Sequence, residues 1–235
     1  MKKILLLFLT FLSVLIPKNV YAAEAYAVVS GFSNITLTFY YDDNKNTHEN
    51  ESNTRAVYKL KEKYNARPEW IQWKIATICF DESFVHYTPK STAHWCRDGH
   101  SLKGLENLNT SMVEDMSYMF SNSNFTSLDL SGLNTRNVRD MNHMFDGCYD
   151  LNSLSLNGLN TENVKNMTSM FNYCEKLKSL DISSFNTINV ENMSYMFYSC
   201  YSLSTIYVSE KWSTENVSNS YSMFSYCHSL LGGCG

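Results

Sequence analysis

The pattern of apolar positions repeats itself along the second half of the chain. The motif V-x-x-M-x-x-M-F begins at Val113, Val138, Val164 and Val190, and returns with one change at Val217. The steps between these valines are 25, 26, 26 and 27 residues. A fixed period of this length is typical of repeat architectures, in which each unit buries its apolar face only against its neighbours.

Each unit contains two different apolar periods. Leu151, Leu154, Leu156 and Leu159 read L-x-x-L-x-L-x-x-L, and the central L-x-L has the period of a short strand with one buried side. The motif after it spaces its apolar residues by three and four, which predicts one face of a short helix. We therefore predict an α/β solenoid, a leucine-rich-repeat-like right-handed stack of short parallel strands with helical returns, capped by an N-terminal β-hairpin region.

Three segments follow from this reading. Residues 1–22 combine a basic start, an apolar run and a small-residue end, which predicts a secretory signal peptide cleaved after Ala22. Residues 23–74 alternate apolar and polar positions and are predicted to form a β-rich cap, with an exposed loop from Asp42 to Arg55. Residues 75–235 are predicted to form the solenoid, with about six coils of period 25–27.

Asparagine recurs at one phase of the repeat, just past the predicted strand. Asn134, Asn160 and Asn186 are each followed by threonine. Since an asparagine amide satisfies backbone groups where a chain turns, these residues are predicted to form a ladder between coils.

The charge balance bears on which partners the chain suits. The net charge is −4 at pH 7, and the first 22 residues hold three lysines and no acid, so the remainder carries −7. An acidic chain is a poor nucleic-acid binder and is repelled by anionic membranes. No second long apolar run follows the signal, so no transmembrane segment is predicted.

Cysteines do not form an evident metal motif. Cys148, Cys174, Cys200 and Cys227 each follow the repeat phenylalanine by three residues and are predicted to stack inside the coils as small buried hydrophobes. Disulfides stay open as the alternative, because the chain is predicted to be secreted. Residues Asp42 to Asn46 are similar to the start of a calcium loop but lack its glycine and terminal glutamate, so neither a metal nor a cofactor is predicted.

The repeat resembles the BspA-like leucine-rich-repeat surface proteins of bacteria. The shared pattern is L-x-x-L-x-L-x-x-[LF]-N-T-x-x-V-x-x-M-x-x-M-F-x-x-C, which stands here as Leu151 to Cys174 and Leu177 to Cys200. The resemblance implies a secreted or cell-surface protein of a host-associated bacterium that adheres to extracellular-matrix proteins or other cells. It implies no catalytic residue, and none is predicted.

The residues between the buried leucines are predicted to form an exposed polar face on the strands. Among them, Asp129, Ser155, Asp181 and Tyr207 are the candidate ligand-binding residues. Short polar side chains lose little entropy on binding, which suits contact with a protein or a glycan. A face that is merely solvated is the plain alternative.

Two other functions stay open. The chain could be a structural module that associates through its last coil, because Leu230 and Leu231 offer little polar cover. It could also be a glycan hydrolase using Asp129 and Asp181, although two strand spacings place these carboxylates beyond the usual separation of a glycosidase pair.

Overall fold

A small sheet closes the N-terminal end of the molecule. The computed structural model describes residues 23–60 and 67–231; the predicted signal peptide lies outside this range. β1 (Glu24–Ser30) and β2 (Ile35–Asp42) form an antiparallel hairpin, and β3 (Thr54–Lys59) pairs with the other side of β1. Helix α1 (Lys45–Glu49) interrupts the predicted loop between β2 and β3, and none of its residues is buried.

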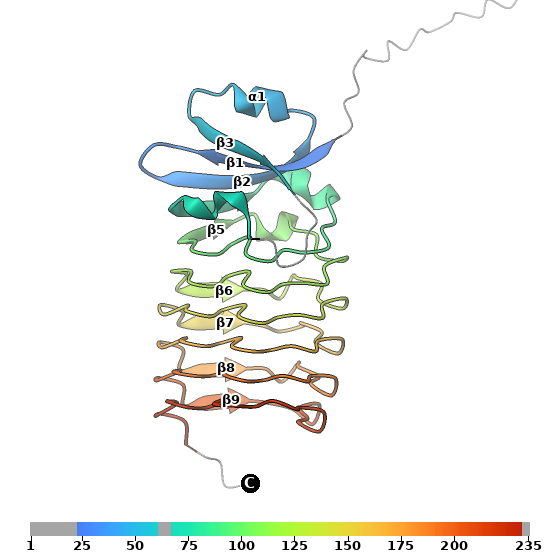
Figure 1. Cartoon of the computed structure of the whole chain (residues 1–235), viewed down its shortest axis with the longest axis vertical. Coiled ribbons are helices and arrows are strands. Elements are labelled where there is room, and N and C mark those ends of the chain that lie inside the picture. The colour runs from blue at the N-terminus through green and yellow to red at the C-terminus, as the bar shows by residue number, and fades with distance from the viewer. Residues whose placement is uncertain (1–22, 61–66, 232–235) are drawn as a thin grey trace, which may run out of the picture.

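The same sheet then changes from antiparallel to parallel pairing. β4 (Ile75–Phe80) runs parallel to β2, and β5 (Ser101–Lys103) runs parallel to β4, so the strand order is β3-β1-β2-β4-β5. Short 3-10 helices lie between these strands and after β5: η1 (Glu69–Gln72), η2 (Glu82–His86) and η3 (Leu105–Asn107). The sheet thus carries the chain from the cap into the first repeats (Figure 1).

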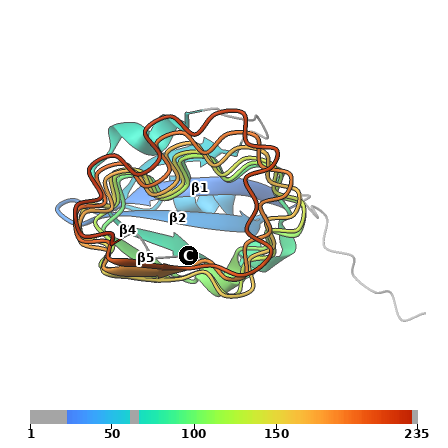
Figure 2. The same cartoon turned by 90° about the horizontal axis from the view of Figure 1, so that it is seen from below.

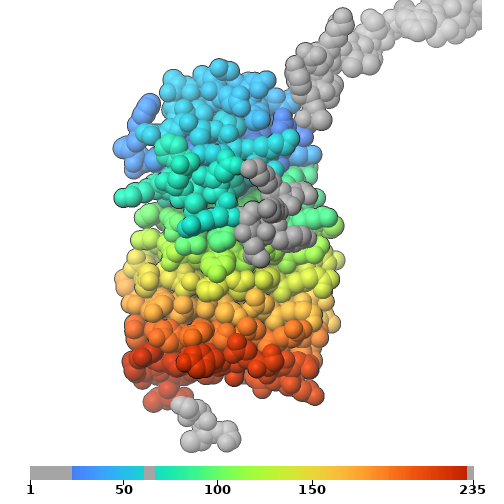
Figure 3. All heavy atoms as spheres, in the orientation of Figure 1, coloured from blue at the N-terminus to red at the C-terminus, as the bar shows by residue number. Residues whose placement is uncertain are grey.

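Below the sheet, the repeats lie one under another as similar coils (Figures 1 and 3), and their outlines superpose when seen along the stack (Figure 2). Four coils carry a short strand each: β6 (Ser127–Asp129), β7 (Ser153–Ser155), β8 (Ser179–Asp181) and β9 (Thr205–Tyr207). Leu128 pairs with Leu154 and Leu180 with Ile206, so the apolar residue of each strand meets its counterpart in the next coil. Leu156 is buried, as the alternation predicts.

Identical side chains stack through the interior of the coils. The rings of Phe120, Phe145, Phe171 and Phe197 lie parallel with centroids 5.5–5.6 Å apart. Beside them, the Sγ atoms of Cys148, Cys174 and Cys200 approach the carbonyl oxygen of the phenylalanine one coil earlier at 3.2, 3.3 and 3.0 Å. These three cysteines are buried and free, which confirms the prediction of small buried side chains at these positions, whereas Cys227, the fourth residue of the predicted column, is half-buried.

The predicted α/β solenoid with helical returns is wrong. Among the described residues, α-helix is confined to α1, and the segments that follow each repeat valine are successive turns. The strands form one mixed five-stranded sheet and two separate two-stranded sheets, β6-β7 and β8-β9, rather than the continuous parallel sheet of a solenoid. The apolar residues of these segments are spaced by three and four positions, which had indicated a helix. Successive three-residue turns bury the same apolar positions.

The backbone hydrogen bonds explain why no helix forms in these segments. Met141, His143 and Phe145 donate their N–H groups to carbonyls of the next coil at 2.8–3.0 Å. An α-helix would direct every N–H to a carbonyl four residues earlier in the same segment. Because alternate N–H groups leave the coil, only three-residue turns such as Met144 to Met141 remain inside it.

The predicted asparagine ladder is wrong in position. The Oδ1 atoms of Asn160 and Asn186 accept from backbone N–H groups two residues later, which is a local turn. The contacts between coils come instead from the following threonines and from Asn163 and its equivalents. Thr161 Oγ1 donates to the carbonyl of Asn186 at 2.9 Å and accepts from the N–H of Asn186 at 2.8 Å.

Candidate binding surface

The candidate residues lie on the outward side of the short strands. Asp129 ends β6 and Asp181 ends β8, and both are exposed, whereas the leucines before them, Leu128 and Leu180, are buried. Ser155 on β7 is half-buried, and Tyr207 on β9 is exposed. The two-residue alternation of a strand therefore holds each polar side chain outside while its neighbour packs in the core.

The structure brings these four residues together only in pairs. Asp129 lies opposite Ser155 in the β6-β7 pair, and Asp181 lies opposite Tyr207 in the β8-β9 pair. The two pairs belong to separate sheets, so no strand pairing joins Ser155 to Asp181. The face is consequently two adjacent patches, one with a carboxylate and a hydroxyl and one with a carboxylate and a phenol.

Each carboxylate is held by a turn that follows its strand. The backbone N–H of Ser131 donates to Asp129 Oδ1 at 3.0 Å, and that of Ser183 donates to Asp181 Oδ1 at 2.9 Å. Hydrogen bonds from Ser131, first its backbone N–H and then its hydroxyl, lower the pKa of Asp129. Hydrogen bonds from Ser183, first its hydroxyl and then its backbone N–H, lower the pKa of Asp181. Both are thus anionic acceptors, whereas a glycosidase acid needs a raised pKa.

A hollow lies beside Asp129, between β5 of the N-terminal sheet and β6. Lys103, Glu106 and Asp129 are among the residues that line it. β5 and β6 belong to different sheets, so the gap between them is not closed by strand pairing. This hollow gives the Asp129 patch a recess with charges of both signs.

The family of the chain follows from its repeats. A family model described as "Mycoplasma protein of unknown function, DUF285" matches residues 94–204 and 121–232, which together are more than half of the chain. The chain belongs to the DUF285 family. No curated protein and no solved structure matches it.

The DUF285 matches include all four candidate residues, from Asp129 to Tyr207, and leave strands β1 to β4 of the N-terminal sheet outside. Within the described part of the chain, no three His, Cys, Asp or Glu side chains gather as metal ligands, and no helix is long and apolar enough to cross a bilayer.

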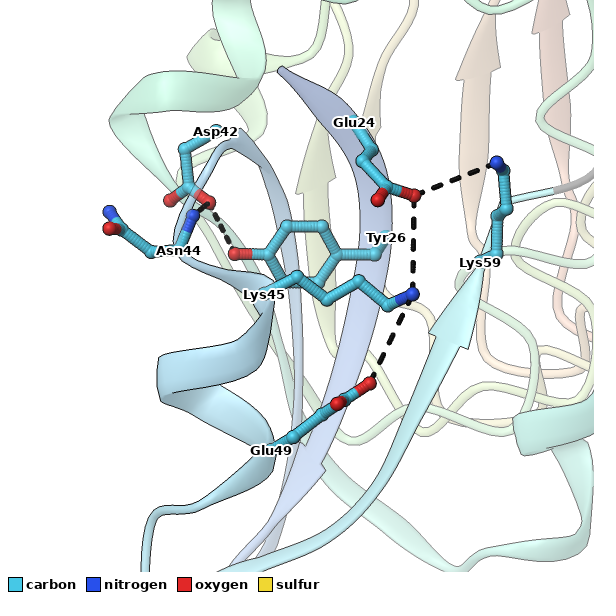
Figure 4. Close-up of polar contacts among 7 residues, drawn as sticks. All are labelled: Glu24, Tyr26, Asp42, Asn44, Lys45, Glu49 and Lys59. Atoms are coloured by element: carbon cyan, nitrogen blue, oxygen red, sulfur yellow. Dashed lines mark hydrogen bonds and ion pairs between the residues drawn. The ribbon is translucent and has the colours of Figure 1, made fainter. Parts of the chain in front are cut away.

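The Asp42 segment, which lies before the DUF285 repeats, is occupied by internal contacts (Figure 4). Asp42 accepts from the hydroxyl of Tyr26 and, at 2.8 Å, from the backbone N–H of Asn44. Nearby, Glu24 lies 4.0 Å from Lys45 and 3.6 Å from Lys59. Burial, followed by the hydrogen bond to Asp42, raises the pKa of Tyr26. These contacts hold α1 and β3 against the hairpin.

The sequence did not predict a second surface on the DUF285 repeats. Six tyrosines form one connected group of rings, called here the tyrosine cluster: Tyr149, Tyr173, Tyr195, Tyr198, Tyr221 and Tyr226. They occupy different positions of the repeat in neighbouring coils, so no single column of the sequence reveals them. The sequence feature that could have indicated this surface is the concentration of tyrosine in the last three turn segments, because stacking of the coils brings these segments together.

Proposed function

We propose that this protein is a secreted or cell-surface binding protein that recognises an extracellular macromolecule through its exposed strand face. The supporting observation is the placement of Asp129, Ser155, Asp181 and Tyr207 on the outer side of strands whose inner side chains pack in the core. The resemblance of the repeats to BspA-like surface proteins and the export signal expected at residues 1–22 also support an extracellular, adhesin-like role.

The strand face suits recognition because its groups are fixed before a ligand arrives. Asp129 and Asp181 are each held by a backbone N–H two residues later. The strands that carry them are paired in register with the neighbouring coil. Pre-organised short side chains avoid most of the ordering cost of association. Host matrix proteins and glycans both offer donors for such carboxylates.

The test is binding of the purified protein to immobilised matrix proteins and glycans, compared with an Asp129→Asn, Asp181→Asn, Tyr207→Ser triple variant. We expect at least about tenfold weaker binding of the variant, because it loses two charge-assisted contacts and an aromatic contact. Glu162→Gln removes an exposed carboxylate outside the strands and serves as the matched control. Equal binding by the protein and the triple variant contradicts the proposal.

A second candidate function is self-association through the last coil. Val208 is 50 %, Phe224 46 % and Leu231 84 % exposed, and they border a hollow also lined by Ile206 and Trp212. Exposed apolar side chains grouped in this way are typical of association surfaces. Light scattering over a range of concentrations should show oligomers that Val208→Glu with Leu231→Glu abolishes, and a monomer throughout contradicts the idea.

A further inference from the structure

The tyrosine cluster is continuous across four successive coils. Tyr198 lies at its centre, with ring centroids 5.7 Å from Tyr173, 5.6 Å from Tyr195 and 5.1 Å from Tyr226. All three contacts are edge-to-face, with interplanar angles of 67–75°. Tyr221 extends the group beyond Tyr195 at 5.4 Å, and Tyr149 extends it beyond Tyr173 at 6.0 Å.

The cluster is open to solvent. Tyr221 is 67 %, Tyr226 53 % and Tyr149 49 % exposed, whereas Tyr173 and Tyr198 are half-buried among their neighbours. Tyrosine supplies a large contact area with few rotatable bonds, and it is enriched at protein interfaces. Rings that already support one another lose even less freedom when a partner covers them.

The surroundings of the cluster favour a cationic partner. The repeats that carry the cluster, residues 138–231, contain nine acidic and five basic residues when all their faces are counted. Lys176, one of the five, is held by Asp150 at 2.5 Å. Burial first, and then the charges of Asp146 and Glu175, raise the pKa of Tyr149, so these carboxylates impose a negative potential on the Tyr149 end of the cluster. The face of an aromatic ring attracts a cation by its own charge distribution.

We propose that the tyrosine cluster binds a protein segment that carries arginine or lysine side chains. The chain makes such a contact internally, because the guanidinium of Arg97 lies 5.9 Å from the ring centre of Tyr118. The rings around Tyr198 meet edge to face, so they do not form the coplanar platform on which a glycan chain would stack. This surface lies outside the strands, so the proposal is independent of the strand face.

The test uses a labelled peptide of six Arg-Ser repeats, the same peptide with each arginine replaced by citrulline, and a neutral hexasaccharide. Binding to the purified protein is followed by fluorescence anisotropy and, for the sugar, by calorimetry. The variant is Tyr195→Ser, Tyr221→Ser, Tyr226→Ser. Each change introduces the serine that a neighbouring coil carries at the same repeat position. Ser169 and Ser222 correspond to Tyr195, Ser194 corresponds to Tyr221, and Ser199 corresponds to Tyr226. We therefore expect the variant to keep the fold.

We expect the arginine peptide to bind the protein and to bind the triple variant at least about tenfold more weakly, with no binding of the citrulline peptide. Tyr118→Ser makes the same change at the repeat position of Tyr195, outside the cluster, and should leave binding unchanged. The triple variant keeps every charge. If the arginine peptide bound the triple variant as tightly as the parent protein, the affinity would come from net charge and the proposal would be overturned. Equal binding of the citrulline peptide, or tighter binding of the sugar, would also overturn it.

Discussion

Two residues in each coil adopt the left-handed backbone conformation. Ser169 and Tyr173 have φ of 54° and 57°, and Ser199, one coil after Tyr173, has φ of 57°. This conformation costs a residue with a side chain on the order of 1 kcal/mol. At each of these residues the backbone N–H bonds to the next coil, as Ser169 does to Ser194, and the following N–H turns back into its own coil, as Met170 does to Met167. The inter-coil hydrogen bonds offset the cost of this reversal. Gly147 fills one of these positions, with φ of 72°, and avoids the cost.

Replacing Gly147 by alanine should destabilise the protein by about 1–2 kcal/mol. A Cβ at this position would lie 2.3 Å from Oδ1 of Asn122, so the amide must move as well. The free energy of unfolding in urea measures the effect. Ser199→Gly changes the equivalent turn in the opposite direction and should cost less than about 0.5 kcal/mol. A loss as large in the control as in Gly147→Ala would refute the argument.

The buried thiols make stability depend on pH in the alkaline range. Burial raises the pKa of Cys148 and of Cys200 to about 12, above the ordinary value of 9.0. Because the folded state favours the protonated thiols, their contribution is complete below pH 9 and is lost as the pH rises from 9 toward 12. We expect a slope of about 1.4 kcal/mol per pH unit for each thiol in that window.

Urea unfolding at pH 7, 9 and 10.5 tests this dependence. The double variant Cys148→Ala, Cys200→Ala is the comparison, because the other titrating groups, tyrosines and lysines included, remain in it. Its stability should fall less steeply above pH 9 than that of the parent. Parallel slopes for the two proteins would show that these thiols ionise as easily in the folded state as in the unfolded state.

At the scale of elements, threonine bridges join one coil to the next. Thr135, Thr161 and Thr187 each donate to a carbonyl of the following coil at 2.7–2.9 Å. Each also lies at 2 % exposure or less, so water does not reach the threonine hydroxyl itself. Hydrogen bonds of this kind matter chiefly because an unmatched buried group is costly.

Thr161→Val should destabilise the protein by about 2 kcal/mol, because valine keeps the shape but leaves the carbonyl and N–H of Asn186 without a partner. Thr126→Val, at an exposed position, is the matched control and should change the free energy of unfolding by less than about 0.5 kcal/mol. A loss below 0.5 kcal/mol in Thr161→Val would mean that water replaces the hydroxyl.

The repeat period and the inward positions were predictable because identical residues recur at one spacing. Met167, Phe171 and Cys174 are buried, as the pattern requires. The helix assigned to them was wrong because burial at these spacings does not distinguish a helix from three-residue turns, and the choice depends on N–H groups that bond to another coil. The outward positions of Asp129 and Asp181 followed from strand alternation, whereas the tyrosine cluster required knowing how the turns align.

At the scale of the whole molecule, the stack has a direction. Met167, Ser169, Phe171 and Tyr173 each donate an N–H to the next coil at 2.9 Å, and the same positions do so in the coils before and after. The last coil presents the equivalent N–H groups of Ser220, Ser222, Phe224 and Tyr226, which have no acceptor among the described residues. Two copies meeting at these ends would place the N–H groups of this segment opposite one another, so this segment could not continue the hydrogen bonding of the stack.

Amide hydrogen exchange should reveal this direction. We expect Ser220, Ser222, Phe224 and Tyr226 to exchange at least about a hundredfold faster than Met193, Tyr195, Phe197 and Ser199 in dilute solution, because only the latter have an acceptor within residues 23–60 and 67–231. Protection of the last coil that increases with protein concentration would indicate self-association. Equal protection of both sets at high dilution is incompatible with an open last coil.

Because every coil forms the same set of hydrogen bonds with the coil before it and with the coil after it, a unit of about 26 residues fits between any two others without altering their bonding. Gene duplication within such a chain can lengthen the molecule in single steps, each of which creates new outward residues free to diverge. Variation in repeat number and in surface chemistry can therefore accumulate quickly in descendants of one ancestral unit.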